Sequence, residues 1–103
     1  MNEFGLDERA TCLMRAVFEK HPRIAEVRVF GSRARGNFAP ESDVDFALFG
    51  DVDARLASRV ASELDELPLP YRFDVEAYPC IEHQPLRDHI DRVGKPFFVA
   101  ESR

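Results

Sequence analysis

Residues 29–49, VFGSRARGNFAPESDVDFALF, join two apolar runs through a polar segment that begins with Gly31 and Ser32. The second run contains two aspartates, Asp43 and Asp45, separated by one residue. In a strand, residues i and i+2 point to the same face, so the two carboxylates project together while the residues between them face the core. Their repulsion is roughly 4 kcal/mol at about 4 Å and an effective dielectric constant near 20. Divalent cations with oxygen ligands commonly offset such repulsion, so both residues are candidate metal ligands.

A third candidate carboxylate, Asp74, lies in the alternating stretch YRFDVEAY at 71–78. The alternation predicts a strand whose apolar face carries Phe73 and Val75, so Asp74 projects from the opposite face. Glu76 lies on that same face and is the alternative to Asp74. If this strand is a neighbour of the strand with the two aspartates, three carboxylates converge. They would form the ligand set of a two-metal site, which activates an attacking oxygen and stabilises a leaving phosphate.

Hydrophobic periodicity predicts helices alternating with strands along the whole chain. The expected helices cover 6–20, 51–67 and 84–94, and the expected strands cover 24–30, 44–49 and 71–78. Residues 31–42 form a connection whose first residues are compatible with a turn of helix, and PFFVA at 96–100 forms a short final strand or a packed tail. No repeat, linker or low-complexity tract interrupts this order. We therefore expect one domain, 1–103, of the α+β or α/β class around a small sheet.

The charge balance limits the classes of partner. The chain has 14 basic and 19 acidic residues and a net charge of −5, which argues against a general nucleic-acid-binding protein. Arg33 and Arg35 nevertheless follow Gly31 and Ser32 closely. A glycine lets backbone approach a phosphate group, whose oxygens a serine hydroxyl and arginines can bind. These four residues are a candidate anion site; the alternative is that the two arginines only make a loop soluble.

Cysteine usage and hydropathy predict a soluble, cytoplasmic protein. Cys12 and Cys80 lack the spacing of a zinc site or of a disulfide framework, and Cys12 is expected to be a small buried residue of the first helix. No apolar run is long enough to cross a bilayer, and the N-terminal segment is too acidic for a signal peptide. His21, His83 and His89 share no metal-binding spacing and are expected at the surface.

The order of these motifs resembles a known family. An apolar residue, Gly31-Ser32, ten further residues, Asp43-Val44-Asp45 and a later single aspartate form a pattern similar to that of the DNA polymerase β-type nucleotidyltransferases. Within that superfamily, the motifs GSRARG and SDVDFAL resemble those of the minimal nucleotidyltransferases, which are antitoxin partners of HEPN-domain toxins. The resemblance spans most of the chain and includes the closing LRDHIDRVGKPFF. It implies a small mixed β-sheet packed against helices.

The resemblance also implies an activity and roles for the residues. Asp43 and Asp45 would hold two Mg²⁺ ions, Asp74 would complete the second metal site or act as a base, and Gly31 with Ser32 would hold the terminal phosphates of ATP. Arg33 and Arg35 are the accompanying candidates for phosphate contact. The implied reaction transfers AMP from ATP to a hydroxyl group, which the subgroup suggests is on a HEPN-type toxin.

Two other function classes compete with that expectation. The first is a non-catalytic antitoxin that inhibits its partner by binding alone, which a lost aspartate or serine in the motif would favour. No motif residue is lost here. The second is an antibiotic-modifying nucleotidyltransferase or a polymerase, whose acceptor or primer would require further domains that 103 residues are not expected to hold. Neither a direct nucleic-acid contact nor a membrane contact is expected.

Overall fold

The β-branched run at 24–30 forms the first strand, β1 (Ile24–Phe30), of a four-stranded sheet. The other strands are β2 (Val44–Gly50), β3 (Phe73–Ala77) and β4 (Lys95–Val99), so PFFVA contributes to a strand rather than to a packed tail. The strand order is β3-β2-β1-β4; β1 is antiparallel to β2 and to β4, and β2 is parallel to β3. The expected mixed sheet of an α+β fold is confirmed.

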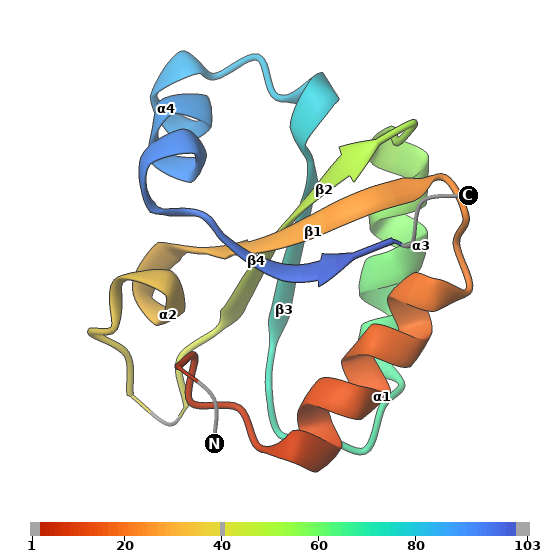
Figure 1. Ribbon diagram of the computed structural model, residues 1–103, viewed down its shortest axis with the longest axis vertical. Coiled ribbons are helices and arrows are strands. Elements are labelled where there is room, and N and C mark those ends of the chain that lie inside the picture. Colours follow the sequence, from red (N-terminus) through yellow and green to blue (C-terminus); the bar gives the residue numbers. More distant parts are fainter. Residues whose placement is uncertain (1–2, 40, 101–103) are drawn as a thin grey trace.

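Residues 3–39 and 41–100 are described by this computed structural model. Its helices, drawn in Figure 1, are α1 (Glu8–Glu19), α2 (Gly31–Arg35), α3 (Ala54–Asp65) and α4 (Gln84–Val93), with a short 3-10 helix, η1 (Tyr78–Cys80). The side chains of Asp7 and Asp53 cap α1 and α3 by accepting hydrogen bonds from backbone N–H groups at 2.7 and 2.9 Å. These caps explain why both helices begin two or three residues later than periodicity predicts.

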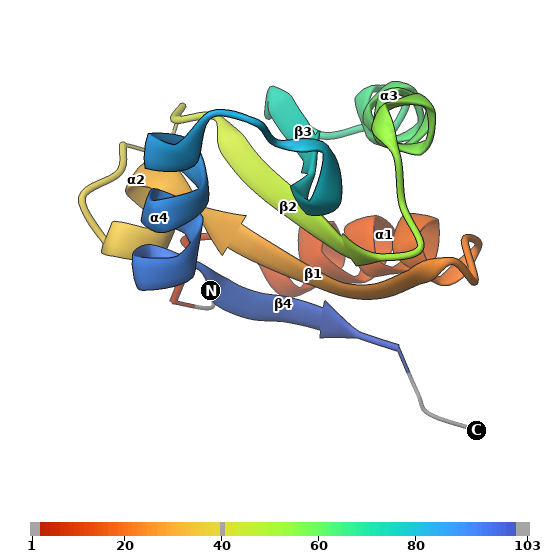
Figure 2. The ribbon, with the colours of Figure 1, turned by 90° about the horizontal axis from the view of Figure 1, so that it is seen from above.

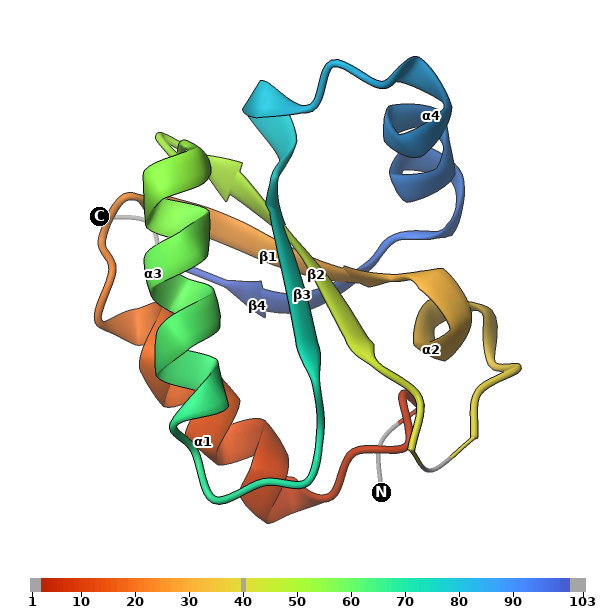
Figure 3. The same ribbon diagram turned by 180° about the vertical axis from the view of Figure 1, so that it is seen from behind.

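Helices cover both faces of the sheet, as Figures 2 and 3 show: α1 and α3 lie on one side, and α2 and α4 on the other. The first side holds the larger core, in which Phe46 of β2 is central. Its ring lies 5.1 Å from the rings of Phe18 and Phe97, measured between centroids, and stacks on Phe73 at 6.2 Å. The strand residues that alternate with this core therefore project toward α2 and α4.

A smaller cluster ties α4 to the second face. Phe30, Ala47 and Ile90 are its buried members. Beside it the Phe49 and Tyr78 rings stack at 4.5 Å, with the Arg28 guanidinium 4.5 Å from the Phe49 ring and the Arg87 guanidinium 4.4 Å from the Tyr78 ring. On β2 this cluster lies beyond Asp45, because Ala47 and Phe49 follow Asp45 at alternate positions of the strand. Near the start of β2, the residues on this face are Asp43 and Asp45.

One expected core residue lies elsewhere. Cys12 is exposed on α1, because the buried stripe of that helix runs through Ala10, Met14, Val17 and Phe18. Position 12 falls on the opposite side of the helix from this stripe. Among residues 3–39 and 41–100, no helix combines the length and the apolar character needed to cross a bilayer.

The central place of Phe46 gives a prediction. Phe46→Ala removes a ring with 0% exposure, so we expect unfolding free energy to fall by about 3–5 kcal/mol in urea titrations. The control is Val99→Ala, because Val99 is 59% exposed and its truncation should change stability by no more than about 0.5 kcal/mol. Equal effects of the two substitutions would contradict this description of the core.

Candidate active site

Strand pairing brings the predicted site residues together. Asp45 pairs with Phe30 on β1, the residue immediately before Gly31, and with Asp74 on β3. The parallel pairing of β2 and β3 therefore meets the condition under which the sequence predicts that the carboxylates converge. Asp43 comes directly before β2, on the face shared by Asp45, and is exposed. Glu76 pairs two residues further along, with Ala47.

Gly31 and Asp45 are in close contact. Gly31 begins α2 with φ of +75°, a left-handed conformation that L side chains rarely adopt. A Cβ atom at this position would collide with Oδ2 of Asp45. The absence of a side chain thus lets the Asp45 carboxylate lie against the backbone that leads into Ser32. The hydroxyl of Ser32 has no hydrogen-bond partner among the described residues.

The carboxylates carry uncompensated negative charge. The pKa of Asp45 is raised to about 6, mainly by burial and also by the nearby Asp74 and Asp43 carboxylates, while the charge of Arg33 partly opposes this increase. Burial also raises the pKa of Glu76, with a contribution from Asp74. Within the part of the chain that the structure describes, none of these four carboxylates has a hydrogen bond or ion pair with another side chain. Negative charge is therefore concentrated and available to a cation.

The chemistry of these donors fits a hard divalent cation. The side chains offer only carboxylate oxygens, the ligands that Mg²⁺ prefers, and their mutual repulsion would be relieved by positive charge. In residues 3–39 and 41–100, however, no three His, Cys, Asp or Glu side chains are already gathered closely enough to hold an ion. Asp43, Asp45 and Asp74 would therefore have to move together when an ion binds.

The two arginines of the predicted anion site differ. Arg35 is exposed and makes no ion pair or hydrogen bond with another described side chain. Arg33 is 1% exposed, so it does not simply make a loop soluble. Its guanidinium lies in the protein interior and donates hydrogen bonds to the carbonyl oxygens of Ser42 and Phe4.

One residue beside the site was expected elsewhere. His89 of α4 lies half-buried, with its ring edge-to-face against Phe30 at 6.1 Å between centroids. The sequence pattern places this histidine at the surface. The sequence signal that would have placed His89 near the sheet is its neighbour Ile90, which is the buried residue of α4.

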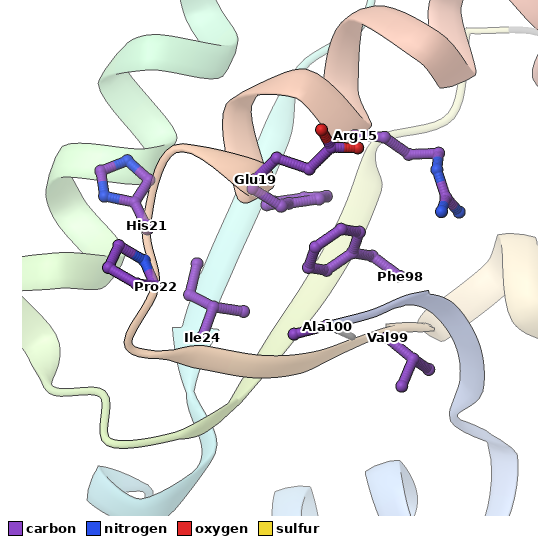
Figure 4. Close-up of a pocket in the computed structure, with 9 residues that line it drawn as sticks. Arg15, Glu19, His21, Pro22, Ile24, Phe98, Val99 and Ala100 are labelled. Carbon is purple, nitrogen blue, oxygen red and sulfur yellow. The ribbon is translucent and has the colours of Figure 1, made fainter. Parts of the chain in front are cut away.

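The hollow drawn in Figure 4 does not contain the carboxylates. It has a volume of about 700 Å³ and lies between the end of α1, the start of β1 and the end of β4. Arg15, Glu19, His21 and Phe98 are among the residues that line it. Ile24, at the first position of β1, also lines the hollow, whereas the site lies beyond Phe30 at the other end of that strand. No predicted site residue contributes to it.

The contact between Gly31 and Asp45 gives a prediction with a matched control. Gly31 and Gly36 both have positive φ, but a Cβ on Gly36 would meet nothing within 4 Å. Each Gly→Ala change should cost about 1 kcal/mol of stability through backbone strain. Only Gly31→Ala should displace the Asp45 carboxylate toward solvent and lower its pKa from about 6, measured by NMR titration of its carboxyl carbon. An unchanged Asp45 titration in Gly31→Ala would contradict the contact.

The raised pKa of Asp45 predicts a pH dependence of stability. The folded protein holds this proton to higher pH than the unfolded chain, so metal-free stability should fall as the pH rises from 3.8 to about 6. Asp45→Asn removes that loss and should be more stable than wild type by roughly 1–3 kcal/mol at pH 7.5, but equal to it near pH 4. Urea titrations at both pH values measure the difference. Asp65→Asn, at an exposed position of α3, should give no pH-dependent difference; a destabilised Asp45→Asn at pH 7.5 would refute the assignment.

Comparisons with known proteins place the chain in a known family. Residues 14–103 match the family described as polymerase beta, nucleotidyltransferase. A segment of 31 residues is 52% identical to the protein of Methanocaldococcus jannaschii named "Putative protein adenylyltransferase". That match covers 30% of this chain and 31% of the archaeal protein, so the aligned segment spans about a third of the length of each.

Solved structures share the fold at low sequence identity. A toxin–antitoxin structure with AMP-PNP superimposes with a TM-score of 0.71 at 19% identity, over 93% of this chain and 76% of the other. A second structure contains the tri-AMPylated HEPN toxin of Shewanella oneidensis in complex with an MNT antitoxin. The match to it has a TM-score of 0.68 at 15% identity, over 92% of this chain and 74% of the other. Together with the family match over residues 14–103, these findings identify the chain as a member of the polymerase beta nucleotidyltransferase family.

Proposed function

We propose that this protein transfers AMP from ATP to a hydroxyl group of a protein partner, with residues 1–103 forming one nucleotidyltransferase domain. The observation that carries the proposal is the position of Asp45. Its carboxylate lies against Gly31 and is paired across the strands with Asp74, so a phosphate bound at Gly31 and Ser32 would lie beside two carboxylates. That juxtaposition of an anion-binding turn with unpaired acids suits a metal-dependent phosphoryl reaction.

In this proposal each motif residue binds or orients a reactant. The backbone at Gly31 and the Ser32 hydroxyl hold the terminal phosphates of ATP, and the exposed Arg35 adds a charge-assisted contact. Asp43 and Asp45 would hold Mg²⁺, with Asp74 as a further ligand. When bound, Mg²⁺ supplies positive charge that neutralises the phosphates and the departing pyrophosphate.

Asp74 has the better position of the two candidates for the third carboxylate. It pairs with Asp45 itself, whereas Glu76 pairs with Ala47 and lies toward the cluster under α4. In this proposal Asp74 receives the proton of the acceptor hydroxyl. The hydroxyl oxygen forms a bond to the α-phosphorus, the bond from that phosphorus to the β-phosphate oxygen breaks, and pyrophosphate leaves with the bonding electrons.

A HEPN-type toxin is the acceptor that we propose. The support comes from the similarity to solved toxin–antitoxin complexes, one of which contains an AMP-PNP molecule and another a tri-AMPylated HEPN toxin. Because ATP is the donor in this proposal, the site of action would be the cytoplasm. Inhibition of the toxin by binding alone is the competing function, and it gives no reason for four acids on one sheet face to lack partners among the described side chains.

Transfer of labelled nucleotide tests the proposal. The protein is incubated with Mg²⁺, ATP labelled at the α-phosphate and a co-purified HEPN-type partner, and the label on the partner is measured. Wild type should label the partner at a hydroxyl side chain, identified by mass spectrometry. Asp45→Asn and Ser32→Ala should reduce labelling by about 100-fold or more, because each removes a group that acts on the reacting phosphates.

The matched control is Asp65→Asn, which should label the partner as wild type does. The inhibition of the partner is measured in the same samples. If the partner stays unlabelled but is inhibited equally by wild type and by Asp45→Asn, the binding function replaces the transfer function.

A further inference from the structure

Arg33 is the one charged side chain buried in the described residues, and it is the largest side chain there with almost no exposure. Its Nε and one Nη donate to the carbonyl oxygen of Ser42 at 3.2 and 2.9 Å. The other Nη donates to the carbonyl oxygen of Phe4 at 2.8 Å. Hydrogen bonds to both sides of the guanidinium thus connect α2 to the loop before β2 and to the N-terminal segment.

Two aromatic rings hold the same guanidinium. Its central carbon lies 5.0 Å from the centre of the Phe38 ring and 5.1 Å from the centre of the Tyr71 ring. Phe38 belongs to the loop after α2, and Tyr71 precedes β3. Arginine suits such a position because its planar, weakly hydrated cation can stack on rings while donating in its own plane.

Arg33 and two of its contacts, Ser42 and Tyr71, lie close in sequence to proposed site residues. Ser42 precedes Asp43, Tyr71 is three residues before Asp74, and Arg33 itself follows Ser32. The loop between α2 and β2 is closed by a backbone hydrogen bond from Ser42 to Ala39, and Val44 then donates to the carbonyl of Arg72. Arg33 is thus the side chain that connects all three segments of the site.

We propose that Arg33 is a positioning residue, which fixes the segment at 42–45 relative to Gly31-Ser32 and to the start of β3. The proposal deepens the transfer function and rests on it for the catalytic consequence, but the placement of the segment is testable without activity. Burying a charge is costly, and an apolar side chain of similar size would often give equal stability. What an apolar side chain could not provide is the connection between three segments, because only the planar guanidinium fork can donate hydrogen bonds in several directions.

Direct phosphate binding by Arg33 is the alternative. The hydrogen bonds to Ser42 and Phe4 and the 1% exposure argue against it, since a phosphate would have to displace main-chain carbonyls to reach the guanidinium. Arg33 therefore acts through Asp43 and Asp45 rather than on the nucleotide.

The test uses Arg33→Lys, which keeps the charge but loses the fork. The control is Arg55→Lys, at an exposed position of α3. Amide hydrogen exchange of the nucleotide-free proteins is measured first. We expect exchange in residues 42–45 and 71–73 to become about tenfold faster in Arg33→Lys, with α1 and α3 unchanged, and no change in Arg55→Lys. Uniform acceleration over all elements, or none in these two segments, would overturn the proposal whether or not the protein transfers AMP.

Kinetics then separate positioning from phosphate binding. For the transfer reaction, well below the melting temperature, Arg33→Lys should lower kcat by about 10–100-fold, the range typical of residues that orient metal ligands, with the KM for ATP changed less than about threefold. A raised KM with unchanged kcat and unchanged exchange would instead make Arg33 a phosphate ligand and overturn the proposal. Should Arg33→Lys fail to fold, Tyr71→Leu weakens the same contact while leaving Arg33 in place, and the same local increase in exchange is expected.

Discussion

The pairing of β2 between β1 and β3 is the constraint on which the site depends. It places Asp45 beside the end of β1 and beside Asp74, where its carboxylate is partly removed from water and surrounded by like charge. No described side chain forms an ion pair with it. A fold of this size has a net stability of only about 5–15 kcal/mol, so such a carboxylate is a substantial cost. The cost is consistent with a site that receives a cation.

The two faces of the sheet divide stability and chemistry between them. Alternate residues of β2 point either to the aromatic core around Phe46 or to the face with Asp45, so the same strand can be well packed and reactive. On the second face, the contact of Ile90 with Phe30 and Ala47 holds α4 to the sheet. The acids therefore occupy a part of the face that α4 does not cover. Shifting the register of β2 by one residue would bury both aspartates in the core, which fixes the register strongly.

Local rules predict most of the fold and the candidate carboxylates. Periodicity indicates the helices and strands, and the i, i+2 rule places Asp43 and Asp45 on one face from the sequence alone. What sequence cannot supply is long-range pairing: that Asp74 lies opposite Asp45 depends on the parallel neighbour relation of two strands joined through α3. The expected burial of Cys12 is wrong because flanking core residues count for less than the angular position of residue 12 itself on α1.

The burial of Arg33 is equally beyond local rules, because its partners at Phe4, Ser42 and Tyr71 are distant in sequence. The partners of Arg33 also affect the neighbouring carboxylates. Arg33 lies close enough for its charge to act on Asp43 and Asp45, and it donates hydrogen bonds to the neutral carbonyl oxygens of Ser42 and Phe4. A bidentate ion pair with Asp45 would have stabilised that carboxylate but occupied the oxygens that a cation needs. By binding carbonyls instead, Arg33 can hold the segment in place while the carboxylates keep their lone pairs for a ligand.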